Sequence, residues 1–247
     1  MLKQILSTCI LAALVLICLC GFAAPEQQTT LNQLRAIVTQ AQSQAVLYGN
    51  CSEVTTLQDA TGEHTSQRDT IYTISDSGSY TFVEEKQEMG ISSRTMLLDP
   101  DEQIGYILKD GVWYRLDEPS IGVAPIVALH RVEENMPYIQ SVRRFDDRYE
   151  VQYDSSQPLA FWNRDFSSYH ILSANATFWI DEKYHLTKIE QTFRIQPEEG
   201  EAVELYFTLD LRSAGMSQSQ VHSALQQKIS ETAPAVVPSV RYVGPIS

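Results

Sequence analysis

The chain has 247 residues, 43% of them hydrophobic, which is enough for one domain with a substantial core. Its 18 lysines and arginines are outnumbered by 31 aspartates and glutamates, giving a formal net charge of −13 at pH 7. A surface this acidic repels phosphate groups, so we expect no nucleic-acid partner.

Residues 1–23 predict a secretory signal peptide. Lys3 precedes an apolar run over residues 9–20, and small residues follow up to Ala23. A positive start, an apolar middle and a small-residue exit are typical of a signal that is cleaved, here after Ala23. We therefore expect a secreted or cell-envelope protein. Its exported domain would span residues 24–231, followed by a proline-containing flexible tail over residues 232–247.

Two alternatives for this segment remain open. Residues 5–24 nearly reach the ~20 apolar residues that span a bilayer, so one is an uncleaved anchor, with membrane contact through this segment alone. The other is lipidation of Cys18 or Cys20. Cys51 is the one cysteine that remains after the signal, so it is either a buried thiol or a link to another chain.

Residues 30–47 predict an amphipathic helix. Their apolar side chains recur every three or four residues, which places them on one stripe of a helix. These positions are Leu31, Leu34, Ile37, Val38, Ala41 and Ala45. Gly49 and Asn50 are expected to end the helix.

After this helix the apolar period changes to two, which predicts strands. The first group is expected over residues 71–74, 80–83, 95–98, 103–108 and 112–116. Asp110-Gly111 between the last two is a strong signal for a tight hairpin turn. Pro125 then opens a short helix, whose apolar face carries Ile126, Leu129 and Val132.

Further strands and a third helix complete the pattern. The strands are expected over residues 138–145, 149–153, 176–180, 186–195 and 202–211, and the helix over residues 217–230. Residues 155–174 are expected to form a long loop. In the last strand, alternate residues from Val203 to Leu211 are all apolar, so we expect other elements to cover that face.

The connections between the strands are tight turns rather than crossover helices, which favours antiparallel pairing. We therefore expect an α+β fold in which a strongly curved antiparallel sheet, an incomplete β-barrel, is wrapped around a few helices. One face of this sheet would be solvated, and the other would contact the helices.

The sequence contains no recognisable pattern for catalysis. It lacks Gly-x-Ser-x-Gly, His-Glu-x-x-His and a glycine-rich phosphate loop. Its five histidines are scattered, without the i, i+4 spacing of a zinc site. Acidic pairs such as Glu198-Glu199 fall in predicted turns, where carboxylates are solvated. We expect a protein that is not an enzyme and that uses no cofactor and no metal.

Two hairpin segments resemble a known family. They are residues 109–114 (Lys-Asp-Gly-Val-Trp-Tyr) and residues 176–190, where Thr-Phe-Trp-Ile-Asp is followed by Leu-Thr-Lys. With the amphipathic helix before the first strand, they are similar to the LolA/LppX-like superfamily of exported, lipoprotein-carrier-like proteins. The resemblance implies an incomplete barrel that holds helices against a hydrophobic concavity for acyl chains. The arginine that latches the helical lid of the carriers has no counterpart in residues 51–59.

The expected function is the binding of a hydrophobic or lipidic ligand, such as an acyl chain, in a cavity between sheet and helices. The residues expected to line this cavity are Ile189, Phe193, Leu205, Phe207 and Leu209. The alternative is a cell-envelope interaction or sensor domain with a packed core, whose partner is a protein. A cavity of ligand size, ~300–1,000 Å³, distinguishes the two.

Overall fold

The computed structural model describes residues 26–75, 78–87, 90–99, 104–109, 112–117, 124–159, 169–232 and 241–242. The expected signal peptide (1–23), the turn at Asp110-Gly111 and most of the expected tail lie outside these residues. Within the tail region, Arg241–Tyr242 form the short strand β12, which runs parallel to β6.

The described strands form one 12-stranded sheet, in the order β12-β6-β5-β4-β3-β2-β1-β11-β10-β9-β8-β7. The first six are β1 (Tyr48–Asp59), β2 (Gly62–Ser75), β3 (Gly78–Gln87), β4 (Gly90–Asp99), β5 (Ile104–Lys109) and β6 (Val112–Asp117). The next five are β7 (Ile139–Arg144), β8 (Arg148–Tyr153), β9 (His170–Ile180), β10 (Leu186–Gln196) and β11 (Val203–Asp210). Every pairing except that of β12 with β6 is antiparallel.

Two meanders make up this sheet. β1 to β6 pair in chain order, and so do β7 to β11. The meanders join where β11 pairs with β1, so that Ser52 lies opposite Asp210. The sheet curves but does not close, because β12 and β7 are its two edges. The expected α+β fold with a curved antiparallel sheet wrapped around helices is confirmed.

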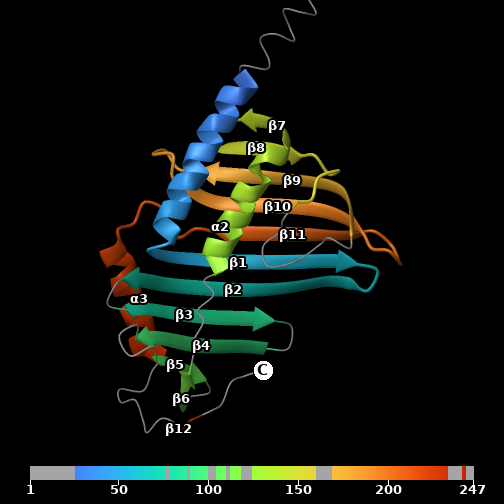
Figure 1. The fold of residues 1–247 in the computed structure, drawn as a ribbon. Coiled ribbons are helices and arrows are strands. Elements are labelled where there is room, and N and C mark those ends of the chain that lie inside the picture. The colour runs from blue at the N-terminus through green and yellow to red at the C-terminus, as the bar shows by residue number, and fades with distance from the viewer. Residues whose placement is uncertain are drawn as a thin grey trace, which may run out of the picture.

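Helices lie on both faces of the sheet. The helix of residues 26–45 (blue in Figure 1) and α2 (Ala124–Asn135) cross the same face, which we call the inner face. α3 (Gln218–Thr232) packs on the opposite, outer face. Two neighbours in β2 show this division, because successive side chains of a strand point to opposite faces. Tyr72 donates a hydrogen bond to the Ala45 carbonyl, whereas Ile71 packs against α3.

The amphipathic stripes explain these positions. Leu34, Ile37 and Val38 are buried against the sheet, and so are Leu129 and Val132 of α2. The polar faces of both helices remain exposed. The short helix η1 (Met136–Tyr138) then leads from α2 into β7.

The expected helix stop at Gly49 and Asn50 is wrong. The helix ends at residue 45, and both residues belong to β1. Gly49 is required for another reason: a Cβ atom there would lie 2.6 Å from Cε1 of Tyr72. The glycine allows the close approach of an aromatic ring, so its role is one of packing rather than of helix capping.

Four strands, β2, β3, β4 and β9, are much longer than the apolar pattern indicated. β2 begins at Gly62 rather than at residue 71, and β9 begins at His170, inside the stretch expected to be a loop. Residues 62–66 are exposed on both faces of the sheet, so no alternation of apolar and polar residues marks them as a strand. By contrast, the hairpin of β5 and β6 is confirmed, since Lys109 pairs with Val112 across two connecting residues.

Candidate ligand-binding site

The five predicted lining residues share the inner face of β10 and β11. The strand register places Ile189 opposite Leu209 and Phe193 opposite Leu205. The two phenylalanines, Phe193 and Phe207, meet edge to face with ring centroids 5.8 Å apart. All five side chains are at most 2% exposed and belong to one core cluster with the inner helices. The structure therefore brings together all five residues that the strand pattern selected.

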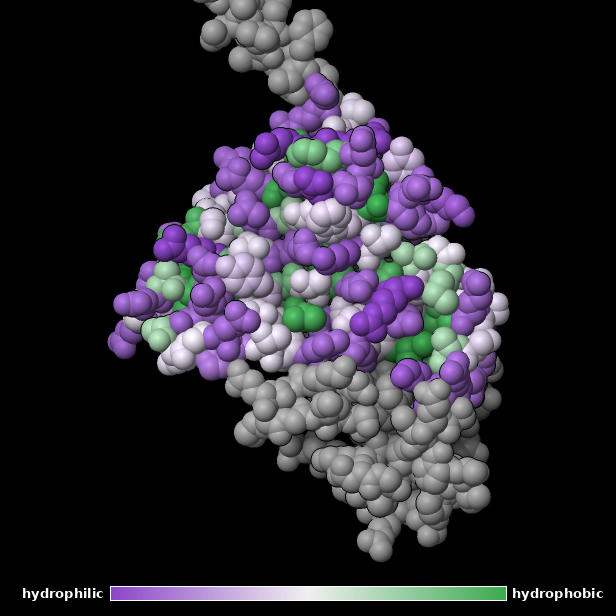
Figure 2. Space-filling view, turned by 180° about the vertical axis from the view of Figure 1, so that it is seen from behind, coloured by the Kyte–Doolittle hydropathy of each residue, from purple (hydrophilic) through white to green (hydrophobic). Residues whose placement is uncertain are grey.

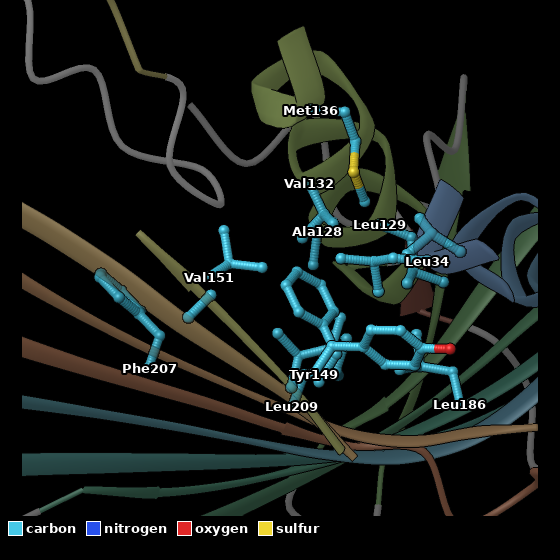
Figure 3. Packing of buried hydrophobic residues seen from close by; sticks show 14 of the residues in the cluster. Leu34, Ala128, Leu129, Val132, Met136, Tyr149, Val151, Leu186, Phe207 and Leu209 are labelled. Carbon is cyan, nitrogen blue, oxygen red and sulfur yellow. The ribbon is translucent and has the colours of Figure 1, made fainter. Parts of the chain in front are cut away.

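The helices cover only part of this face. Figure 3 shows α2 side chains over Tyr149 and Leu209, with Leu34 of the first helix beside them. Phe207 and Val151 lie to one side of this helical cover in the same view. The inner face thus has a helix-covered part around Leu209 and a second part that extends along the strands through Phe207 toward Leu205.

A polar pair that the sequence analysis missed lies in this second part. Tyr153 of β8 and Gln191 of β10 both point to the inner face and are 2% and 3% exposed. The strand between them, β9, presents only Ala174 and Ala176 there. Strands are ~4.8 Å apart, so a tyrosine and a glutamine can meet above two alanines.

The two polar groups are close but are not satisfied. Burial raises the pKa of the Tyr153 hydroxyl well above its usual value. The nearby Gln191 amide lowers this pKa by a smaller amount. Tyr153 Oη and Gln191 Nε2 nevertheless have no hydrogen-bond partner of normal geometry in the described part of the chain. A buried polar group without a partner costs ~1–3 kcal/mol, so this arrangement is unusual in a packed core.

Polar contacts at the rim attach the first helix to its surroundings. Arg144 of β7 donates to Gln33 Oε1 at 3.0 Å and to the Tyr184 hydroxyl at 3.2 Å. Gln42 donates to the Leu129 carbonyl of α2 at 3.1 Å. Gln44 donates to the Ser213 carbonyl at 2.9 Å. None of these contacts belongs to the sheet ladder, and they add to the buried apolar stripe that holds the helix on the sheet.

The described residues also line a small cavity near Cys51 and an open pocket on the outer face of the sheet. A cavity of about 20 Å³, lined in part by Ala41, Cys51 and Tyr72, has room for about one water molecule. On the outer side of β9 to β11, a more open hollow of about 220 Å³ is lined mainly by polar residues, such as Glu190 and Thr208. Figure 2 shows that hydrophilic side chains dominate this side of the molecule. The apolar side chains of these strands are therefore directed inward.

Cys51 has the environment of a buried thiol. It is fully buried in β1, and its Sγ lies 3.6 Å from the Thr70 carbonyl oxygen. Burial, followed by the charge of Glu53, raises the pKa of this thiol well above its usual range. A protonated, inaccessible thiol is unreactive, so the structure favours the buried role of Cys51 over a link to another chain.

Two further features concern metals and membranes. Within the described ranges, no group of three or more histidine, cysteine, aspartate or glutamate side chains is placed to hold a metal ion. The helices of that part of the chain are all too short or too polar to cross a bilayer.

No family model matches the chain, and no curated protein matches it. Among solved structures it is similar to LprF from Mycobacterium bovis, with 11% identity and a TM-score of 0.39, over 74% of this chain and 93% of that one. It is also similar to a DUF1329 family protein from Desulfovibrio piger, with 11% identity and a TM-score of 0.24, over 80% of this chain and 99% of that one.

A third similar structure is a domain from Vibrio parahaemolyticus named for outer membrane lipoprotein sorting, with 10% identity and a TM-score of 0.20, over 81% of this chain and 99% of that one. Because all three TM-scores are below 0.5, the function of this chain has to be inferred from its own residues.

Proposed function

We propose that this chain is an exported, non-catalytic domain that binds a hydrophobic or lipidic ligand between its sheet and its inner helices. The proposed lining residues are Ile189, Phe193, Leu205, Phe207 and Leu209. Export follows from the signal pattern of residues 1–23, with residues 24–231 as the domain.

One observation carries this proposal. The inner face is apolar along β10 and β11, and the helix above it is attached at its rim by side-chain hydrogen bonds. Moving this helix aside would break these bonds, ~0.5–1.5 kcal/mol each, and uncover its buried apolar stripe, but would leave the strand pairing intact. The apolar face exposed in this way would admit an apolar molecule.

A second candidate has its own support. The small cavity beside Cys51 measures about 20 Å³, and the five proposed lining residues are already at most 2% exposed. A core packed this closely also suits an interaction or sensor domain of the cell envelope that holds no ligand and whose surface binds a protein.

The variant Leu205→Trp separates the two candidates. Leu205 is 1% exposed, so the larger side chain should lower the free energy of unfolding of the ligand-free protein by ~1–3 kcal/mol under either candidate. If the inner face opens to hold a ligand, the indole also occupies part of that space, and binding of a fluorescent fatty acid falls at least tenfold. The matched control is Tyr206→Trp, because Tyr206 is the next residue and is 36% exposed on the outer face.

The measurements are thermal unfolding of each variant and titration of the parent with the fluorescent fatty acid. A parent that does not bind rejects lipid binding in favour of the interaction domain. Native mass spectrometry of the gently purified protein adds an independent result, since a retained lipid appears directly as added mass.

A further inference from the structure

We propose that Tyr153 and Gln191 form a polar subsite on the inner face that binds a neutral carbonyl oxygen, as in an ester or amide, of an otherwise apolar ligand. This inference rests on the proposed function and adds the chemistry of the ligand's polar group.

The position of the pair supports a binding role. Tyr153 and Gln191 come from strands on either side of β9, whose inner residues Ala174 and Ala176 are small. Phe207 lies directly opposite Gln191 on β11, and Phe193 is the next inward residue along β10. The pair is thus a polar point surrounded by apolar side chains, in the part of the inner face beside the helical cover.

The chemistry of the pair defines what it can bind. Both unsatisfied atoms are hydrogen-bond donors, a phenolic O–H and an amide N–H. Two neighbouring donors match in number the two lone pairs of one carbonyl oxygen. An alkyl chain alone would leave both donors unpaired, which costs free energy in an apolar environment.

Charge selects a neutral group over a carboxylate. The buried residues of the described chain include no lysine or arginine that could neutralise an anion. A carboxylate beside this pair would therefore be buried without a counterion, which costs far more than burying a neutral carbonyl group. An ester or amide carbonyl satisfies the donors without a buried charge.

Three probes of similar size test this assignment: methyl decanoate, decanoate and tridecane. Each is measured by its displacement of the dye N-phenyl-1-naphthylamine from the parent and from the variants Tyr153→Phe and Gln191→Leu. Each variant should weaken methyl decanoate about tenfold, the equivalent of ~1.4 kcal/mol, and change tridecane less than twofold. The parent should bind decanoate more weakly than its methyl ester at pH 8.

The control is Thr192→Val, which removes a polar group from the adjacent, outward-facing position of β10. Equal effects of Tyr153→Phe or Gln191→Leu on ester and alkane, or no effect on either, overturn the subsite while the ligand-binding function stands. Binding of decanoate as tight as that of its ester overturns the selection for a neutral group. If the parent binds neither the dye nor any probe, the proposed function fails and the subsite fails with it.

Unfolding measurements identify a purely structural role of the pair. Gln191→Leu removes an unsatisfied donor, so the ligand-free variant should unfold at a temperature equal to or above that of the parent. Clear destabilisation of this variant, with ester binding unchanged, assigns Gln191 to the packed core and overturns the subsite.

Discussion

Replacing Gly49 by alanine tests how tightly the end of the first helix is seated on the sheet. The new Cβ would lie 2.6 Å from Cε1 and 2.7 Å from the hydroxyl oxygen of Tyr72. Carbon atoms normally approach to ~3.5–4.0 Å, so the ring has to retreat by about 1 Å. Tyr72 is fully buried and donates a 2.7 Å hydrogen bond to the Ala45 carbonyl, so this movement breaks the contact with the helix end.

The cost of Gly49→Ala has two parts. Overpacking a core costs ~1–3 kcal/mol, and a buried hydroxyl without a partner adds ~1–3 kcal/mol. The free energy of unfolding should therefore fall by about 2–5 kcal/mol. Tyr72→Phe removes only the hydrogen bond and should cost ~1 kcal/mol. Gln58→Ala changes an exposed side chain of the same strand and should stay within ~0.5 kcal/mol of the parent.

Urea unfolding followed by circular dichroism measures these differences. At a slope of ~2 kcal/mol/M, the midpoint of Gly49→Ala should fall by about 1–2.5 M with the slope unchanged. A loss below about 0.5 kcal/mol for Gly49→Ala, or a larger loss for Tyr72→Phe than for Gly49→Ala, would refute the tight seating of this ring.

Two further predictions concern the inner helix and a turn. Arg144→Ala removes hydrogen bonds to Gln33 and Tyr184 and should lower the free energy of unfolding by about 1 kcal/mol. Arg143→Ala is the control, since the Arg143 side chain is 79% exposed and its loss should lower the free energy of unfolding much less. Equal thermal unfolding of the two variants contradicts this prediction. Burial raises the pKa of Asp181, but hydrogen bonds from His185 and Lys183 outweigh it and lower that pKa overall. This carboxylate therefore stabilises the fold above its ordinary pKa and loses that effect as the pH falls through the lowered value. Asp181→Asn should flatten the decline in unfolding temperature as the pH falls below the ordinary pKa of an aspartate, and an unchanged decline rejects the linkage.

The strands with one buried face were predictable, because burial imposes an alternation on the sequence. Alternate residues of β11 from Leu205 to Leu209 are buried, as the apolar pattern indicated. The start of β2 had no such signal, since residues 62–66 are exposed on both faces. Gly49 was assigned to the wrong role, because a glycine that ends a helix and one that accommodates a ring look alike without the position of Tyr72.

The apolar residues proposed to line the site were predictable for the same reason, whereas the polar pair was missed. Gln191 lies midway between Ile189 and Phe193 on β10, and alternate residues of a strand share one face. This spacing alone could have predicted that Gln191 points inward. Tyr153 gave no comparable sign, because a tyrosine at the end of a short strand can serve as ordinary core. That the two meet depends on β9 lying between their strands, which is a property of the sheet order and not of either segment.

The pairing of β1 with β11, which we call the seam between the two meanders, affects the folding of the nascent chain. β1 is made early, yet its second neighbour is one of the last strands to be synthesised. Until then, one edge of β1 exposes free backbone groups, and such an edge pairs readily with other chains. The contacts across this seam also have a high sequence separation, which slows folding. A chain released before β11 is complete would therefore aggregate, and a partner that shields β1 during synthesis or export would raise the yield of folded protein.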